Sequence, residues 1–195
     1  MEAKIKKTHY LLCIVLLMFW GCIGLHYYDL YITPAKVENN VKINKTLQIE
    51  DIETNMAFWH QRILYRKNPY QVQYFPLNQW AKMPGELIKD TIIHYYRNSS
   101  FFKKVINDNS SITPEIMMRI TIDALEMLQK EKQWYAHLAL YIEMMDVKTE
   151  KTLLTHSFDR IMQIKGKKAR YLPEKISEIL QQELLTIIKK LRMSG

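Results

Sequence analysis

The chain has 195 residues and a formal net charge of +8; 48% of its residues are hydrophobic and 25% are charged. This composition is that of a globular protein, and it excludes extensive disorder and fibrous repeats. The length suits one domain with a substantial core. With only 5 glycines and 6 prolines, little of the chain is left for a flexible linker.

The N-terminal segment has the layout of an export signal. Three lysines within the first seven residues precede an uncharged apolar run from Leu11 to Trp20. That run is shorter than the roughly 20 apolar residues of a membrane-spanning helix. It ends in Gly21-Cys22, and a small residue directly before a cysteine resembles the lipobox of bacterial lipoproteins.

The lipobox resemblance implies that residues 1–21 are a signal peptide and that Cys22 becomes the mature N-terminus. Cys22 would then carry a diacylglyceryl group and a fatty acyl group such as palmitate. Because Ile23 rather than aspartate follows it, the resemblance favours the outer membrane. The other cysteine, Cys13, would leave with the signal, so no disulfide is expected. An uncleaved membrane anchor and a buried helix stay open as alternatives.

The first half of the exported part predicts short strands. Residues 25–32 are aromatic and β-rich and predict a strand that ends before Pro34, and residues 47–53 predict a second one. A polar loop at 36–44 separates them, and residues 55–61 predict a connector.

The stretch from Arg62 to Pro84 contains the densest pattern of the chain. It predicts strands at 63–66 and 70–75 around a turn at Lys67-Asn68-Pro69. Trp80 is expected to fill a junction between layers, and Pro84 to open a helix, where its missing N–H costs nothing.

The second half predicts longer elements. Residues 85–97 and a segment from Pro173 onward carry helical apolar stripes. Strands are expected at 101–106, 118–124, 134–142 and 153–164, with a charged hairpin tip at 130–132. The predicted fold class is therefore α+β: a two-layer domain, residues 22–195, with a mixed, mainly antiparallel sheet of six or seven strands covered by two helices.

No catalytic signature is present in the sequence. It contains no nucleophile elbow, P-loop or dinucleotide fingerprint, and the histidines form no i, i+4 pair. His137 and His156 are predicted on facing strands, as cross-strand neighbours on a solvated face rather than as metal ligands. The expectation is a chain that is not an enzyme and holds no metal or non-covalent cofactor.

Two groups of side chains are candidates for contacts with a partner. The basic run from Lys165 to Arg170 predicts a solvated loop, with anionic headgroups as an alternative partner and no nucleic acid. The aromatic residues of the central unit either belong to the core or line a lipid groove or protein-docking face. From this unit, the candidates for partner or lipid contact are Tyr65, Arg66, Tyr74 and Trp80.

The order of several short motifs resembles a known family. After the lipid-type cysteine come Tyr27-Tyr28-Asp29-Leu30, Arg62-Ile63-Leu64-Tyr65-Arg66, Val72-Gln73-Tyr74-Phe75, Trp80-Ala81 with Pro84, and Ser99-Ser100-Phe101-Phe102 with Val105. This order is similar to that of the ABC-type transport auxiliary lipoprotein family, which includes paraquat-inducible protein C. The similarity runs from Cys22 to about Leu191.

The family resemblance implies a non-enzymatic periplasmic lipoprotein on the outer membrane, facing the periplasm. Its implied partners are a protein with mammalian-cell-entry (MCE) domains and an ABC permease or ATPase complex that moves phospholipid or other lipid between membranes. It would serve as a docking collar or terminus, with a homo-oligomeric ring as one arrangement. Two other hypotheses stay open: a periplasmic lipid-binding carrier, and an inner-membrane-anchored structural component of a secretion or pilus assembly.

Overall fold

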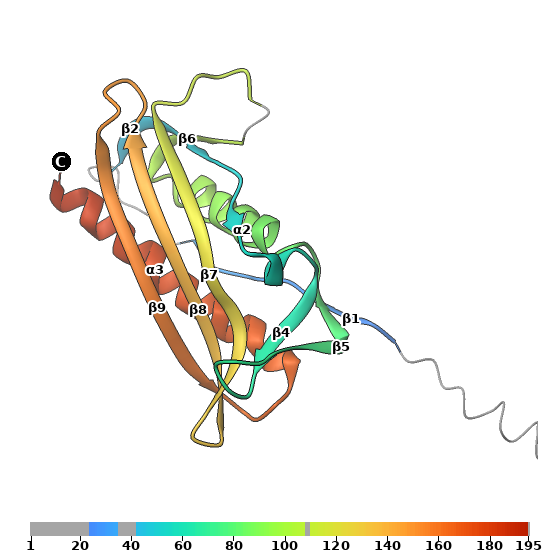
Figure 1. Ribbon diagram of the computed structural model, residues 1–195. Coiled ribbons are helices and arrows are strands. Elements are labelled where there is room, and N and C mark those ends of the chain that lie inside the picture. Colours follow the sequence, from blue (N-terminus) through green and yellow to red (C-terminus); the bar gives the residue numbers. More distant parts are fainter. Residues whose placement is uncertain (1–23, 35–41, 108–109, 195) are drawn as a thin grey trace, which may run out of the picture.

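The computed structural model describes residues 24–34, 42–107 and 110–194. The predicted signal peptide, Cys22 and most of the predicted loop at 36–44 lie outside these ranges. Within them, nine strands form one mixed sheet and two α-helices pack on it (Figure 1). The described part contains no helix that is both long and apolar enough to cross a membrane.

The elements follow one another as short strands, a helix, three long strands and a final helix. In chain order they are β1 His26–Tyr28, β2 Ile43–Ile49, β3 Glu53–Thr54, the 3-10 turn η2 Met56–Phe58, β4 Arg62–Arg66, β5 Val72–Trp80, α2 Pro84–Ser99, β6 Phe102–Ile106, β7 Ile116–Lys130, β8 Gln133–Asp146, β9 Thr152–Ile164, the 3-10 turn η3 Ala169–Tyr171 and α3 Leu172–Ser194.

Strand β7 is the centre of the sheet. Along one edge it pairs antiparallel with β8, which in turn pairs with β9. Along its other edge it pairs in parallel with β2, then β3, then β4. Strand β6 continues the sheet beyond β2, whereas β5 and β1 continue it beyond β4. Three short strands therefore share one edge of a single long strand.

The α+β class, the mixed sheet and the two helices are confirmed, but the predicted sheet was wrong in two respects. It has nine strands rather than six or seven, and five of its pairings are parallel: β1–β5, β2–β6, β2–β7, β3–β7 and β4–β7. The long ladders from β7 to β9 are antiparallel, as expected. The parallel pairs join segments far apart in the sequence, and local alternation carries no information about such pairs.

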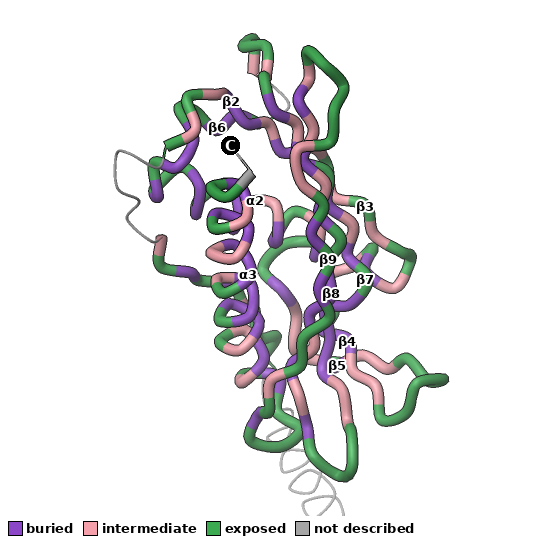
Figure 2. The backbone as a smooth tube through the Cα atoms, turned by 90° about the vertical axis from the view of Figure 1, so that its left-hand side faces the viewer, coloured by how far each residue is buried: buried purple, intermediate pink, exposed green. Residues whose placement is uncertain are grey.

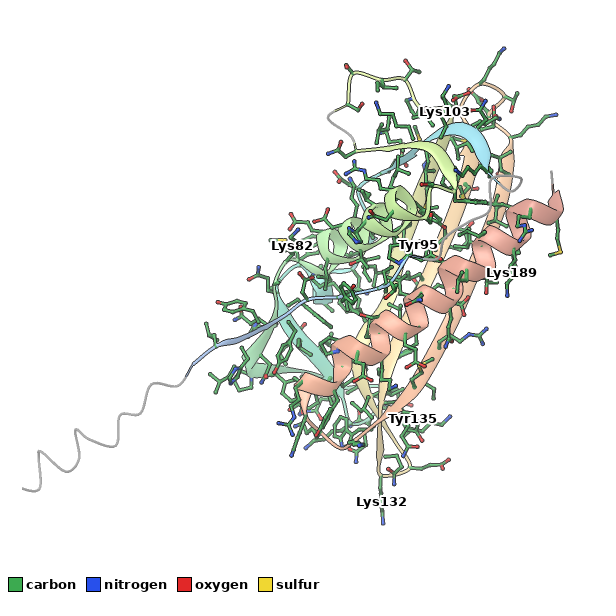
Figure 3. All side chains as sticks on the ribbon, turned by 180° about the vertical axis from the view of Figure 1, so that it is seen from behind. Lys82, Tyr95, Lys103, Lys132, Tyr135 and Lys189 are labelled. Atoms are coloured by element: carbon green, nitrogen blue, oxygen red, sulfur yellow. The ribbon has the colours of Figure 1, made fainter. Side chains whose placement is uncertain are left out.

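The predicted strand at 25–32 is shorter in the structure, because its second half has another role. Residues 29–32 run between α2 and α3 (Figure 3). Leu30 and Ile32 are buried there, and the backbone N–H of Tyr31 donates to Ser177 Oγ of α3 at 3.1 Å. The segment therefore fills the space between the two helices instead of extending the sheet.

Both helices begin and pack as their patterns predict. α2 starts at Pro84 and is followed by Ser100 in the left-handed conformation (φ 55°). The apolar stripe of each helix is buried against the sheet, and Figure 2 shows both helices on the same side of it. We call this side the inner face. The opposite, outer face of β7, β8 and β9 has no helix over it among the described elements; it carries Arg119, Thr121, Glu143, Tyr141, Ser157, Asp159 and Ile161.

Candidate functional site

The four described candidate residues lie on two adjacent strands but do not form one site. Successive side chains of a strand point to opposite faces of a sheet. Tyr65 of β4 pairs with Gln73, and Leu64 pairs with Tyr74. Tyr65 also pairs with Met127 of β7, on the inner face, whereas Leu64 pairs with Glu126, on the outer face. Arg66 and Tyr74 share the face of Leu64 and therefore point to the outer face. Cys22, the candidate lipid attachment site, lies outside the described residues.

Trp80 is a core residue. It is 1% exposed, at the end of β5, where Tyr28 of β1 pairs with it. Its backbone N–H donates to the carbonyl of Gln61 at 2.7 Å. Of the two hypotheses for the aromatic residues, the core hypothesis fits Trp80, because so small an exposed fraction leaves no surface for a partner.

Tyr65 belongs to an aromatic group on the inner face. Its ring lies 4.8 Å from that of Phe75 and 6.1 Å from that of Trp134. The ammonium of Lys167 lies over this group, 3.8 Å from the Tyr65 ring centre, 5.6 Å from Phe75 and 5.8 Å from Trp134. The turn at Gly166 (φ 74°) returns the chain over the rings in this way. Lys167, which belongs to the basic run from Lys165 to Arg170, therefore covers the aromatic group.

Arg66 takes part in a charged network on the outer face. Its Nε donates to Glu126 Oε2 at 2.7 Å, and the Glu126 side chain is only 5% exposed. His137, opposite Glu126 on β8, lies 3.2 Å from Glu126 through Nδ1 and 2.9 Å from Asp159 through Nε2. Burial lowers the pKa of His137, but the hydrogen bonds to both carboxylates outweigh it and hold that pKa above the ordinary value.

Tyr74 is half-buried under the chain that joins β3 to β4. Its ring meets that of His60 edge-on at 4.4 Å, and the Arg62 guanidinium lies 5.0 Å from its centre. Its hydroxyl donates to the carbonyl of Ala57 at 3.3 Å. The side chain therefore fixes this connector. Tyr70, in the neighbouring turn, is 96% exposed.

His137 and His156 are not cross-strand neighbours, contrary to the prediction. His137 pairs with Ile161, and His156 pairs with Ile142, so the two rings lie on opposite faces of the sheet. His156 faces α3, where its Nε2 lies 2.8 Å from Glu183 Oε2. No group of three or more metal-ligating side chains is found in residues 24–34, 42–107 and 110–194.

Sequence reasoning missed the carboxylates that organise both networks. Glu126 lies on the outer face and Glu183 on α3, where Arg160 Nε donates to it at 2.9 Å. Glu126 stands between Leu125 and Met127, which are themselves buried, and Glu183 directly precedes the buried Leu184. A carboxylate inside such a run indicates a buried charge that needs a cationic partner. The sequence therefore contained the signal for a buried charge, but it did not identify the cationic partner.

The comparisons with known proteins agree on fold and family. Residues 28–187 match the ABC-type transport auxiliary lipoprotein component family. A Xanthomonas campestris protein of family DUF330 shares the fold with a TM-score of 0.75 at 12% identity, over 87% of this chain and 96% of its own.

Two further solved structures resemble the chain. An uncharacterized protein has a TM-score of 0.67 at 10% identity, over 86% of this chain and 99% of its own. A hypothetical protein of Chlamydia trachomatis has a TM-score of 0.50 at 7% identity, over 77% and 96%. No curated protein sequence matches the chain. The family match covers most of the described residues, and the chain therefore belongs to the ABC-type transport auxiliary lipoprotein family.

Proposed function

We propose that this protein is a lipoprotein of the outer membrane, attached through Cys22 and facing the periplasm, that serves an ABC/MCE-type system moving lipid between the two membranes. The observation that carries the proposal is the family match at residues 28–187, which begins six residues after a cysteine at the end of an export-type segment. In this proposal the chain catalyses nothing. It connects the transport complex to the membrane.

The outer face of β7–β9 is the proposed contact surface for an MCE-domain protein or its ABC complex. Tyr141, 40% exposed, pairs with Ser157 near the middle of this face, and Ile161, 38% exposed, lies four residues farther along β9, opposite His137. Of the sequence candidates, Arg66 and Tyr74 border this surface, whereas Tyr65 and Trp80 belong to the inner face and the core. Strand β9 pairs only with β8 within the described chain, so its second edge offers a route to a homo-oligomeric ring.

The lipid-carrier hypothesis has less support. It requires a space for an acyl chain between the sheet and α3. That interface is part of one continuous hydrophobic core, in which Ile176, Leu180, Leu184 and Ile187 are each 0% exposed. A bound acyl chain would therefore require these side chains to move apart.

The proposal is tested by purifying the full chain from membranes in mild detergent and identifying its partners by mass spectrometry. Recovery of an MCE-domain protein or its permease is expected. Recovery of pilus or secretion components would replace the proposal. Lipid labelling is expected to be lost in Cys22→Ser, and unchanged labelling would remove the proposed anchor.

The contact surface has its own matched pair of variants. Tyr141→Glu places a charge at the middle of the outer face, and Met193→Glu places one on α3, where the side chain is 82% exposed. The first is expected to reduce partner recovery and the second to leave it unchanged. Equal recovery in both would move the contact surface elsewhere.

A further inference from the structure

Three turns at one end of the sheet bring together positive charges that are distant in the sequence. Leu128 pairs with Arg66 and Lys130 pairs with Gln133, while Trp134 pairs with Ile164. Continuing this register places Lys67, Lys130 and Lys165 at the same end of four adjacent strands. We call this the basic end; it consists of the exposed cations Lys67, Lys130, Lys132, Lys165, Lys167, Lys168 and Arg170.

The basic end is poorly compensated by acidic groups. Within segments 67–70, 130–132 and 165–170 the sequence contains one acidic residue, Glu131. Tyr70 projects from the β4–β5 turn in the same region and is 96% exposed. Figure 3 shows Lys132 at this end and Lys103 at the opposite end of the molecule. A cluster of cations with one projecting tyrosine matches the chemistry of an anionic membrane surface, where lysine meets phosphate and tyrosine lies at headgroup level.

The β7–β8 turn keeps its charges at a conformational cost. Glu131 and Lys132 both have positive φ, 49° and 65°, which non-glycine residues adopt reluctantly. Asparagine and glycine would suit such a two-residue turn better. Unfavourable backbone conformations of this kind are concentrated at functional positions. The turn therefore supports a role for the lysine at its tip.

The proposed lipid attachment site precedes β1, which pairs with β5, the strand that begins at the β4–β5 turn of the basic end. Cys22 lies four residues before His26, a distance of at most about 14 Å of extended chain. His26 pairs with Asn78, which is six residues, at most about 20 Å, along β5 from Val72 at the β4–β5 turn. These lengths allow the basic end to reach the headgroups of the membrane into which a lipid on Cys22 would insert.

We propose that the basic end binds the anionic phospholipid headgroups of the membrane that holds the lipid anchor, and so fixes the orientation of the domain on that membrane. The inference rests on the anchor at Cys22 but not on the identity of the transport partner. Lipid and cations act together, and the cations set which end of the sheet faces the bilayer.

The experiment uses the full chain, extracted from membranes, with its lipidation established by intact mass. It is reconstituted into vesicles of phosphatidylcholine alone or of phosphatidylcholine with phosphatidylglycerol. Amide hydrogen exchange is then followed in peptides covering 66–72, 129–134 and 164–171. With phosphatidylglycerol, exchange in these peptides is expected to slow by about five-fold, the ratio that corresponds to one surface-bound lysine, and high salt is expected to abolish the effect.

A matched pair of charge-reversal variants locates the effect. Lys132→Glu with Lys165→Glu alters the basic end, and Lys103→Glu with Lys104→Glu alters two exposed lysines on β6. The proposal is supported if Lys132→Glu with Lys165→Glu loses the slowing of exchange and Lys103→Glu with Lys104→Glu keeps it. Equal protection in vesicles without phosphatidylglycerol, equal loss in both pairs, or protection that requires a co-purified protein would each overturn it. A chain without lipid on Cys22 would instead refute the anchor in the proposed function.

Discussion

The ammonium of Lys167 lies 3.8 Å from the centre of the Tyr65 ring, although 102 positions separate the two residues in the sequence. This contact joins the loop after β9 to strand β4 across the inner face. A cation over an aromatic face contributes about 0.5–1 kcal/mol at exposed sites and more where water is excluded. The contact therefore determines where the basic loop lies.

Replacing this cation is expected to loosen the loop. Lys167→Gln should lower the free energy of unfolding by about 1 kcal/mol and change the fluorescence of Trp134, whose ring lies 5.8 Å from the ammonium. Lys165→Gln, in the same loop, should cost less than about 0.5 kcal/mol. Urea titrations of both variants make the comparison. An equal loss of unfolding free energy in the two variants would mean that the charge of Lys167 contributes to stability and its ring contact does not.

The buried carboxylate of Glu126 depends on its cationic neighbours. Arg66→Met leaves this carboxylate with His137 alone, and we expect a loss of about 2 kcal/mol, less than for a fully buried pair because the Arg66 side chain is 25% exposed. Adding Glu126→Gln to the same chain should recover part of the loss. A double-mutant cycle by chemical denaturation measures the coupling. A double variant as unstable as the sum of the two singles would show that the residues are independent.

The stability of the protein should depend on pH through His137. Its pKa is raised in the folded chain despite partial burial, because both ring nitrogens face carboxylates. Protonated His137 therefore stabilises the fold fully below its ordinary pKa of about 6.5, and this contribution disappears as the pH rises through the higher folded value. Unfolding titrations from mildly acidic to mildly basic pH should show this decline. In His137→Gln the decline should be absent, and a decline that persists there would assign it to another group.

The attachment of α3 to β9 should depend on one carboxylate. Glu183 accepts from Arg160 and contacts His156, and its side chain is 7% exposed. Glu183→Gln removes the charge and should cost about 2–3 kcal/mol. Glu178→Gln changes an exposed position of the same helix and should cost less than about 0.5 kcal/mol. Similar melting temperatures for the two variants would exclude Glu183 as the attachment point.

Local sequence patterns were sufficient for elements whose signals are contained within a few residues. Pro84 marks the start of α2, and the charged tip around Glu131 joins two strands of clear alternation. Both signals act between neighbours in the chain, through the fixed φ of proline and the period of two in a strand. Such features can be inferred without knowing what lies on the other side of the molecule.

Long-range register could not be inferred in the same way. Leu47 and Leu64 both belong to strands that pair with β7, but 17 positions separate them and no local pattern assigns them to the same edge. Strand alternation places Tyr65 and Arg66 on opposite faces. Their partners, Lys167 for Tyr65 and Glu126 for Arg66, follow only from the three-dimensional fold. The candidate site was therefore predicted as a segment, and its contacts required the fold.

The segment between the helices would also determine how the domain bears a pull from the proposed lipid anchor. Force from a lipid on Cys22 would reach the fold first at β1, whose three residues pair with β5. Beyond that pairing, the chain is held by Leu30 and Ile32, buried between α2 and α3. Drag on a transport complex docked to the outer face would thus load both helices together before any long strand separates. In the proposed function, the residues that complete the core between the two helices would therefore also transmit force between the membrane anchor and the transport complex.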